Sequence, residues 1–433
     1  MLAPVAPHTT ETRRAVDAVW RIESARLIAG LARYTGDIGL AEDLAQDALV
    51  AALERWALAG IPAKPGAWLM TAAKNRAIDL GRRRQRLIIK QEEIGRDVEQ
   101  RQTETAPDRD PALDALDDDI GDDLLRLIFV ACHPVLATEA RVALTLRLLG
   151  GLTTEEVARA FLVPAPTVAQ RIVRAKRTLS AAHVPFEVPR GPDLAERLAS
   201  VLEVIYLIFN EGYAATAGDD WIRPALCEDA LRLGRILAGL APDEPEVHGL
   251  VALMELQASR LRARTAPNGA PILLLDQDRG RWDYILINRG LAALARAESL
   301  NPVRGPYTLQ AALAACHARA RTPEETDWPR IAALYAALTQ QTPSPVVELN
   351  RAVALGMAFG PQAGLDIVDT IKDEPALAGY HLLPSVRGDL LAKLGRHDEA
   401  REEFTRAADL TQNARERDLL LARAAASSQT SLR

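Results

Sequence analysis

Residues 65–86 carry the side chains best suited to bind a nucleic acid. The segment reads PGAWLMTAAKNRAIDLGRRRQR, with polar residues three or four apart followed by a run of arginines. On a helix this spacing places Thr71, Asn75 and Asp79 along one face, where short polar groups can bind unpaired bases. Arginines neutralise phosphates. The strand-binding residues that we predict are Thr71, Asn75, Arg76, Asp79, Arg82, Arg83 and Arg84.

A second basic set of side chains lies in a helix-turn-helix pattern. Thr153 and Glu156 form a capping box, which predicts a short helix over 154–161. A turn at 162–164 separates it from a second, basic helix over 167–181, and in such motifs the second helix enters the major groove. The residues expected to contact DNA are Thr167, Gln170, Arg171, Arg174, Lys176 and Arg177.

Residues 41–56, AEDLAQDALVAALERW, predict an amphipathic helix with an acidic face. Its apolar residues recur at helical spacing and should pack on a core helix over 11–35. Asp43, Gln46 and Asp47 lie on another face.

Residues 271–284, PILLLDQDRGRWDY, place three carboxylates at a spacing that could bind a divalent cation. The alternative, which we favour, is a salt-bridged turn with an aromatic ring packed beneath it. Sequence alone does not assign this motif a role beyond these two. Its residues are Asp276, Asp278, Arg279, Trp282 and Asp283.

The composition predicts an all-α protein of two or three domains. The 433 residues are 48% hydrophobic and 25% charged, and Ala, Leu and Arg dominate. No run of about 18 uncharged apolar residues is present, so we expect no membrane-spanning helix. The N-terminal residues do not have the pattern of a secretory signal. The three cysteines are far apart in the chain, so we expect reduced thiols and a cytoplasmic protein.

Charge divides the chain into four parts. The net charge of −6 argues against a nucleic-acid partner, but residues 11–90 carry +5 and residues 124–190 carry +5. Residues 91–123 carry −10, and residues 191–433 carry −6. We therefore predict domains at 1–90, 124–184 and 185–433, with an acidic linker over 91–123. This linker is either a solvated tether or a segment that occupies a basic channel of a partner.

The last part of the chain predicts a helical repeat. Small and large apolar residues recur at the spacing of a tetratricopeptide helix pair, and residues 348–368 form a weaker copy. Repeats of this kind stack into a solenoid that binds partners. The residues that carry the stronger copy are Gly388, Leu391, Gly395, Ala400, Phe404 and Ala407.

The order of these segments resembles the extracytoplasmic-function (ECF) sigma factors. Residues 41–56 are similar to the helix that binds the polymerase clamp, residues 65–86 to the helix that melts and reads the −10 promoter element, and residues 124–184 to the domain that reads the −35 element. The stretch IFNEGY at 208–213 and the DQDR–WD stretch resemble the signature of members with a large tetratricopeptide-like C-terminal extension.

This resemblance implies core RNA polymerase and promoter DNA as partners, with no enzymatic activity, no cofactor and no metal. It also implies a regulatory C-terminal domain, acting through a protein partner or an intramolecular contact. The sequence departs from the family at Ala165, Pro166 and Ala169, so phosphate contacts of the second helix are better supported than its base contacts.

Two other functions remain open from the sequence. The first is a helix-turn-helix regulator that acts without polymerase and carries a solenoid for a partner, which leaves residues 41–56 and 65–86 unexplained. The second is an enzyme with a metal on Asp276, Asp278 and Asp283, for which the sequence offers neither a nucleophile–base pair nor a phosphate loop.

Overall fold

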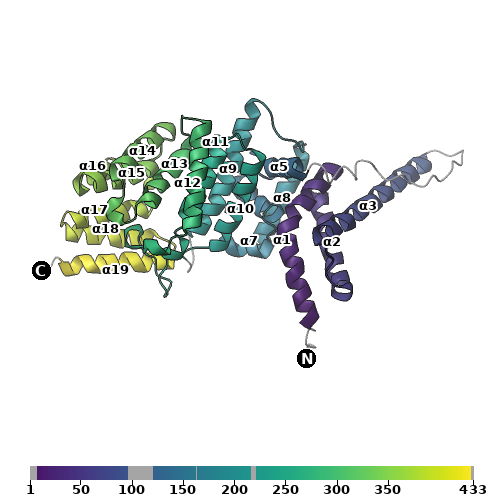
Figure 1. Ribbon diagram of the computed structural model, residues 1–433, viewed down its shortest axis with the longest axis horizontal. Helices are drawn as coiled ribbons and strands as arrows, with labels where there is room; N and C mark the ends of the chain where they lie inside the picture. Colours follow the sequence, from purple (N-terminus) through teal and green to yellow (C-terminus); the bar gives the residue numbers. More distant parts are fainter. Residues whose placement is uncertain (1–6, 96–119, 162, 216–220, 431–433) are drawn as a thin grey trace. The chain divides into compact units, whose positions relative to one another are not determined.

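The computed structural model describes residues 7–95, 120–161, 163–215 and 221–430 (Figure 1). The described residues form α-helices joined by turns and short 3-10 helices, and an isolated β-bridge joins Thr265 and Pro271. The prediction of an all-α fold is confirmed. The chain divides into two compact units, Met1–Val204 and Ile205–Arg433, and helix α9 (Pro192–Tyr213) contributes residues to both.

The first three helices of the first unit are α1 (Pro7–Thr35), α2 (Ile38–Ala59) and α3 (Pro65–Gly95). Helix α1 ends where Gly36 takes a φ of +65°, and Asp37 caps α2 by accepting a hydrogen bond from the Leu40 N–H at 2.9 Å. The Trp68 ring packs edge-on against Trp56, with centroids 5.4 Å apart, so Trp68 is part of the packing between α2 and α3.

The next four helices are α5 (Ile120–Ala131), α6 (Thr138–Leu148), α7 (Thr154–Phe161) and α8 (Ala165–Ala181). The capping box is confirmed, because Thr153 N–H donates to Glu156 Oε2 at 2.8 Å and Glu156 N–H donates to Thr153 Oγ1 at 3.1 Å. These reciprocal bonds satisfy two N–H groups that the first turn of α7 would leave unpaired.

The acidic segment predicted over 91–123 falls mostly outside the described residues, but its two ends are helical. Helix α3 continues to Gly95 and α5 begins at Ile120. The prediction of a solvated linker is wrong for Asp123, whose carboxylate is buried. It pairs with Arg126 at 2.6 Å and with Arg33 of α1 at 3.4 Å. These two cations compensate the cost of removing the carboxylate from water.

The second unit is a succession of helices, each packed against the next along the chain (Figure 1). Alanine and leucine dominate their contacting faces, and prolines stand at the first turns of seven of the helices named here. The helices are α10 (Pro224–Leu240), α11 (Pro245–Ala258), α12 (Tyr284–Leu300), α13 (Pro306–Arg319), α14 (Trp328–Gln341), α15 (Pro345–Phe359), α16 (Pro361–Ile371), α17 (Leu382–Lys393), α18 (His397–Leu410) and α19 (Ala414–Thr430).

Helix α11 ends at Ala258. Ser259 closes it by donating its hydroxyl hydrogen to Leu256 O at 2.7 Å, and the Ser259 carbonyl then accepts from the Asp283 N–H at 2.8 Å. A 3-10 turn, Leu261–Ala263, follows. The chain therefore leaves the helix to contact the 271–284 segment, a pairing that helical periodicity does not reveal.

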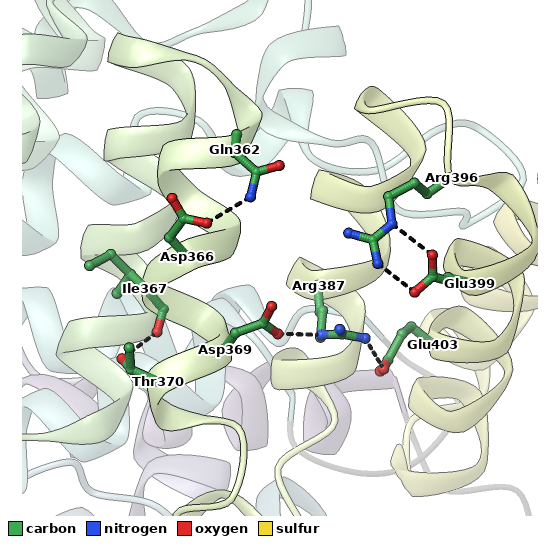
Figure 2. A network of polar contacts seen from close by, with 9 residues as sticks. All are labelled: Gln362, Asp366, Ile367, Asp369, Thr370, Arg387, Arg396, Glu399 and Glu403. Carbon is green, nitrogen blue, oxygen red and sulfur yellow. Dashed lines mark hydrogen bonds and ion pairs between the residues drawn. The ribbon is translucent and has the colours of Figure 1, made fainter.

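Near the C-terminus, α15 packs against α16 and α17 packs against α18. Gly388 lies so close to Phe404 and Ala400 that an added Cβ would sit 3.0 Å from the Phe404 ring, and Gly364 approaches the Ala352 carbonyl similarly. Figure 2 shows Arg387 of α17 linking two other helices, with Nε 2.9 Å from Asp369 of α16 and Nη1 2.8 Å from Glu403 of α18.

No described helix combines the length and the apolar composition needed to cross a bilayer. The three cysteines are buried free thiols, and burial raises the pKa of Cys132 to about 11 and that of Cys227 to about 12.

Candidate nucleic-acid interface

Helix α3 presents the predicted strand-binding residues on one exposed face. Thr71, Asn75 and Asp79 are exposed, and Arg76 and Arg82 are exposed as well. The opposite face is anchored by a separate set of apolar side chains, which are the buried residues Leu69, Ala73 and Ala77. The side chains of Arg83 and Arg84 lie outside the described residues. Leu80 is 42% exposed.

Helix α8 is also divided into a buried and an exposed face. Its core side chains are Val168, Ile172, Ala175 and Leu179. Gln170, Arg174 and Arg177 are exposed, and Thr167 and Arg171 are half-buried. Exposed cations one turn apart on one helix can follow a phosphate backbone. Lys176 points elsewhere and is described below.

Helix α2 keeps two of its predicted protein-binding residues exposed. Asp43 and Asp47 face solvent, while Gln46 turns inward and donates to Glu42 Oε1 at 2.6 Å. Asp47 also lies 3.8 Å from the Arg76 guanidinium of α3. Both side chains of this pair are more than half exposed, so it contributes about 0–1 kcal/mol and leaves each partner free to bind elsewhere.

Comparison with known proteins assigns these two helical modules. Residues 22–87 match the family model of sigma-70 region 2, and residues 126–179 match that of sigma-70 region 4. An uncharacterized protein of Rhizobium meliloti (strain 1021), R00370, is 45% identical over 391 residues, which cover 90% of each chain. The chain therefore carries regions 2 and 4 of a sigma-70 factor. Residues 197–298 match a further family of unknown function, DUF6596, and regions 2 and 4 followed by this domain give an ECF-type architecture.

A sigma factor is not an enzyme, because the polymerase to which it binds performs the chemistry. Region 2 of this sigma factor holds α2 and α3, with the acidic face and the polar face described above. Region 4 holds α7 and α8, which are the helix-turn-helix. Each set of predicted contact residues therefore lies in the region whose family role is to make that contact.

Regions 2 and 4 of the sigma factor contact each other through Glu42, a residue that the sequence did not single out. Its side chain is 3% exposed and accepts from Arg147 Nε of α6 at 2.7 Å. It also pairs with Lys176 Nζ of α8. In this arrangement Lys176 is bound to region 2, and a DNA contact by Lys176, as predicted, requires this pair to separate.

The electrostatic balance at Glu42 favours the charged carboxylate. Burial raises the pKa of Glu42, but Lys176 and Arg147 lower it more, so the net shift is downward. The carboxylate is therefore ionised near neutral pH and holds both cations. No sequence signal marks this contact, because Glu42 lies 105 residues from Arg147 in the chain.

The DQDR–WD stretch of the sigma factor lies in its DUF6596 domain, where its charged residues support the turns around it. Asp278 accepts from the Gly280 N–H, and Asp283 caps α12 by accepting from the N–H groups of Ile285 and Leu286. These bonds fit the turn that we favoured from the sequence. Asp276 is exposed.

Arg279 and Trp282 are the buried members of this stretch. The Arg279 guanidinium donates to the carbonyls of His317 and Ala320, at 2.8 and 2.6 Å, and so caps the C-terminal end of α13. It also lies 4.8 Å from the centroid of the Trp282 ring. The expected aromatic packing is present, but the charges pair with the backbone rather than with one another.

The cation site considered from the sequence finds no support in this geometry. Within the described ranges, no three His, Cys, Asp or Glu side chains are grouped so that they could hold a metal ion. Two of the three carboxylates in question, Asp278 and Asp283, accept hydrogen bonds from the backbone instead.

Proposed function

We propose that this sigma factor binds core RNA polymerase through Asp43, Gln46 and Asp47. It then directs transcription initiation at promoters that have a −10 element and a −35 element. Helix α3 would read the melted −10 strand, and α8 would bind the −35 duplex. The observation that carries the proposal is the coincidence of the region 2 and region 4 matches with two helices whose polar faces are exposed. It would act where core polymerase is, in the cytoplasm.

Run-off transcription tests this proposal. The full chain is mixed with core polymerase and a library of genomic fragments, and transcripts that depend on it identify its promoters. A double variant, Thr71→Ala with Asn75→Ala, should bind core polymerase normally but lose transcription from these promoters, because its strand-reading face is removed. The matched control is Ala67→Ser, at an exposed position on the same helix. A chain that neither binds core polymerase nor supports any transcript would refute the proposal.

We also propose that the C-terminal helices form a tetratricopeptide-like solenoid that regulates regions 2 and 4, through a protein partner or an intramolecular contact. More than half of the chain lies beyond region 4, and residues 191–433 carry −6 where residues 11–90 and 124–190 carry +5 each. The close helix crossings at Gly364 and Gly388 support the repeat, because small residues at crossings are typical of such pairs.

The DQDR–WD stretch allows a test of this regulation. If Asp278 only braces its turn, Asp278→Ala should lower the melting temperature and reduce transcription in proportion to the folded protein lost. If the stretch takes part in regulation, a variant that melts normally should show altered transcription. Asp276→Ala is the second variant to compare, since Asp276 lies in the same stretch and is exposed. If both variants fold fully and transcribe normally, the stretch takes no part in regulation.

A further inference from the structure

Three arginines are buried together in the second unit without a carboxylate partner. Arg260, Arg264 and Arg279 are 8%, 7% and 7% exposed. None of the three forms an ion pair with a residue that the structure describes. Buried cations are nearly always paired, because removing a charge from water is costly. Three buried arginines without an ion-pair partner are therefore unusual.

The three guanidinium groups alternate with two aromatic rings. Arg264 lies 3.5 Å from the centroid of Tyr213, and Arg260 lies 5.8 Å from the same ring. Arg260 then lies 5.9 Å from the Trp282 ring, and Arg279 lies 4.8 Å from it. Arg260 is the central cation of this series, and its two ring contacts are at the outer limit of cation–π distance, about 6 Å.

The outer two arginines are compensated by backbone carbonyls. Arg279 donates to the carbonyls at the end of α13, as described above, and Arg264 donates to the Tyr213 carbonyl at the end of α9. A helix C-terminus carries a partial negative charge, so each of these cations has an electrostatic partner. Their positions are explained by the fold alone.

Arg260 has no such partner. Its Nε is buried without an acceptor. Nearby donors are also unpaired, namely Nε of Arg279 and the indole N–H of Trp282. Burial lowers the pKa of Arg264 and that of Arg279, and repulsion from Arg260 lowers both further.

His317 adds no positive charge to this group. Burial first, and then Arg260 and Arg279, lower its pKa to about 3, so its ring is neutral near pH 7. Its Nδ1 is buried and unpaired. The surroundings of Arg260 thus combine an excess of positive charge with several unused hydrogen-bonding groups, which is the environment that stabilises a bound anion.

We infer that Arg260 is the centre of a binding site for a small oxyanion, either a phosphate or a carboxylate. The planar guanidinium offers two parallel N–H groups, which match the oxygens of both ligands. The site lies in the DUF6596 domain and includes Arg279 and Trp282 of the DQDR–WD stretch. The inference does not depend on promoter recognition, and it gives the second unit a ligand of its own.

Thermal unfolding of the full chain tests the site with inorganic phosphate and with acetate, each compared with chloride at the same ionic strength. A ligand that binds only the folded state raises the melting temperature. We expect an upward shift of roughly 2–4 °C for the wild type in at least one of these anions. A shift in phosphate alone identifies a phosphate ligand, and a shift in acetate identifies a carboxylate.

Arg260→Met should abolish this shift, and Arg262→Met, two residues away and exposed, should retain it. Calorimetric titration of the wild type with each anion measures binding directly and does not depend on whether the variants fold. Absence of heat and of any shift, or an equal shift in Arg260→Met, would overturn the inference.

One competing source of charge is the chain itself, which carries Asp219 and Asp220 shortly after Tyr213. Both lie outside the described residues. A double variant, Asp219→Asn with Asp220→Asn, separates the two explanations. An external ligand predicts that this variant keeps its response to the anion. The alternative is that this double variant loses as much stability as Arg260→Met and that combining the changes causes no further loss. These carboxylates would then occupy the site, which would overturn the inference.

Discussion

Replacing Glu42 by Gln should weaken the contact between regions 2 and 4. The substitution keeps the shape of the side chain but removes the charge that Arg147 and Lys176 share. Breaking a fully buried pair costs about 3–5 kcal/mol, and an exposed pair is worth about 0–1 kcal/mol. Arg147 and Lys176 are 18% and 21% exposed, so water can partly resolvate both. We therefore expect a loss of about 2 kcal/mol in the free energy of unfolding.

Denaturant unfolding of the full chain measures this loss, with Asp43→Asn as the matched control on the same helix. Asp43 is exposed, so its replacement should change stability by less than about 0.5 kcal/mol. A double-mutant cycle of Glu42→Gln with Arg147→Met isolates the Glu42–Arg147 interaction. We expect a coupling energy of about 1–2 kcal/mol. Equal stability of Glu42→Gln and the wild type, or additive single changes, would refute the reasoning.

The pH dependence gives a second measure of the same contact. The folded-state pKa of Glu42 is lowered, so its ionised form contributes stability above the unfolded-state pKa of about 4.3. That contribution is lost as pH falls through the lower, folded-state value. Between pH 5 and pH 3 the wild type should lose more stability than Glu42→Gln, and the two curves should converge. Parallel curves would contradict the assignment.

Three further predictions concern the other surfaces. Asp43→Lys with Asp47→Lys should reduce affinity for core polymerase at least about tenfold through charge reversal, measured by co-sedimentation, while the chain stays folded. Arg174→Ala and Arg177→Ala should each lower the salt dependence of −35 duplex binding by about one unit of slope, measured by filter binding at several salt concentrations. Arg279→Met should lower the free energy of unfolding by about 3 kcal/mol, because it leaves two helix-end carbonyls unpaired, and denaturant titration checks this loss.

The sequence by itself determined the local structure of regions 2 and 4. A capping box at Thr153 and Glu156 fixed the start of α7, since its hydrogen bonds join residues three apart. The basic residues of 170–177 marked α8 as the basic helix of the motif for the same reason, because they lie in a single helix. The family resemblance rested on these local features and was confirmed by the region 2 and region 4 matches.

The tertiary structure alone decided which charges meet. Glu42 looked like one more member of an acidic face, but docking of region 4 buried it between Arg147 and Lys176. Helix α11 ends at Ala258, and the turn that follows carries Arg260 into the core. Periodicity specifies the face of a helix on which a side chain lies. Its partners across a contact depend on how separate helices pack, and no local pattern in the chain encodes that packing.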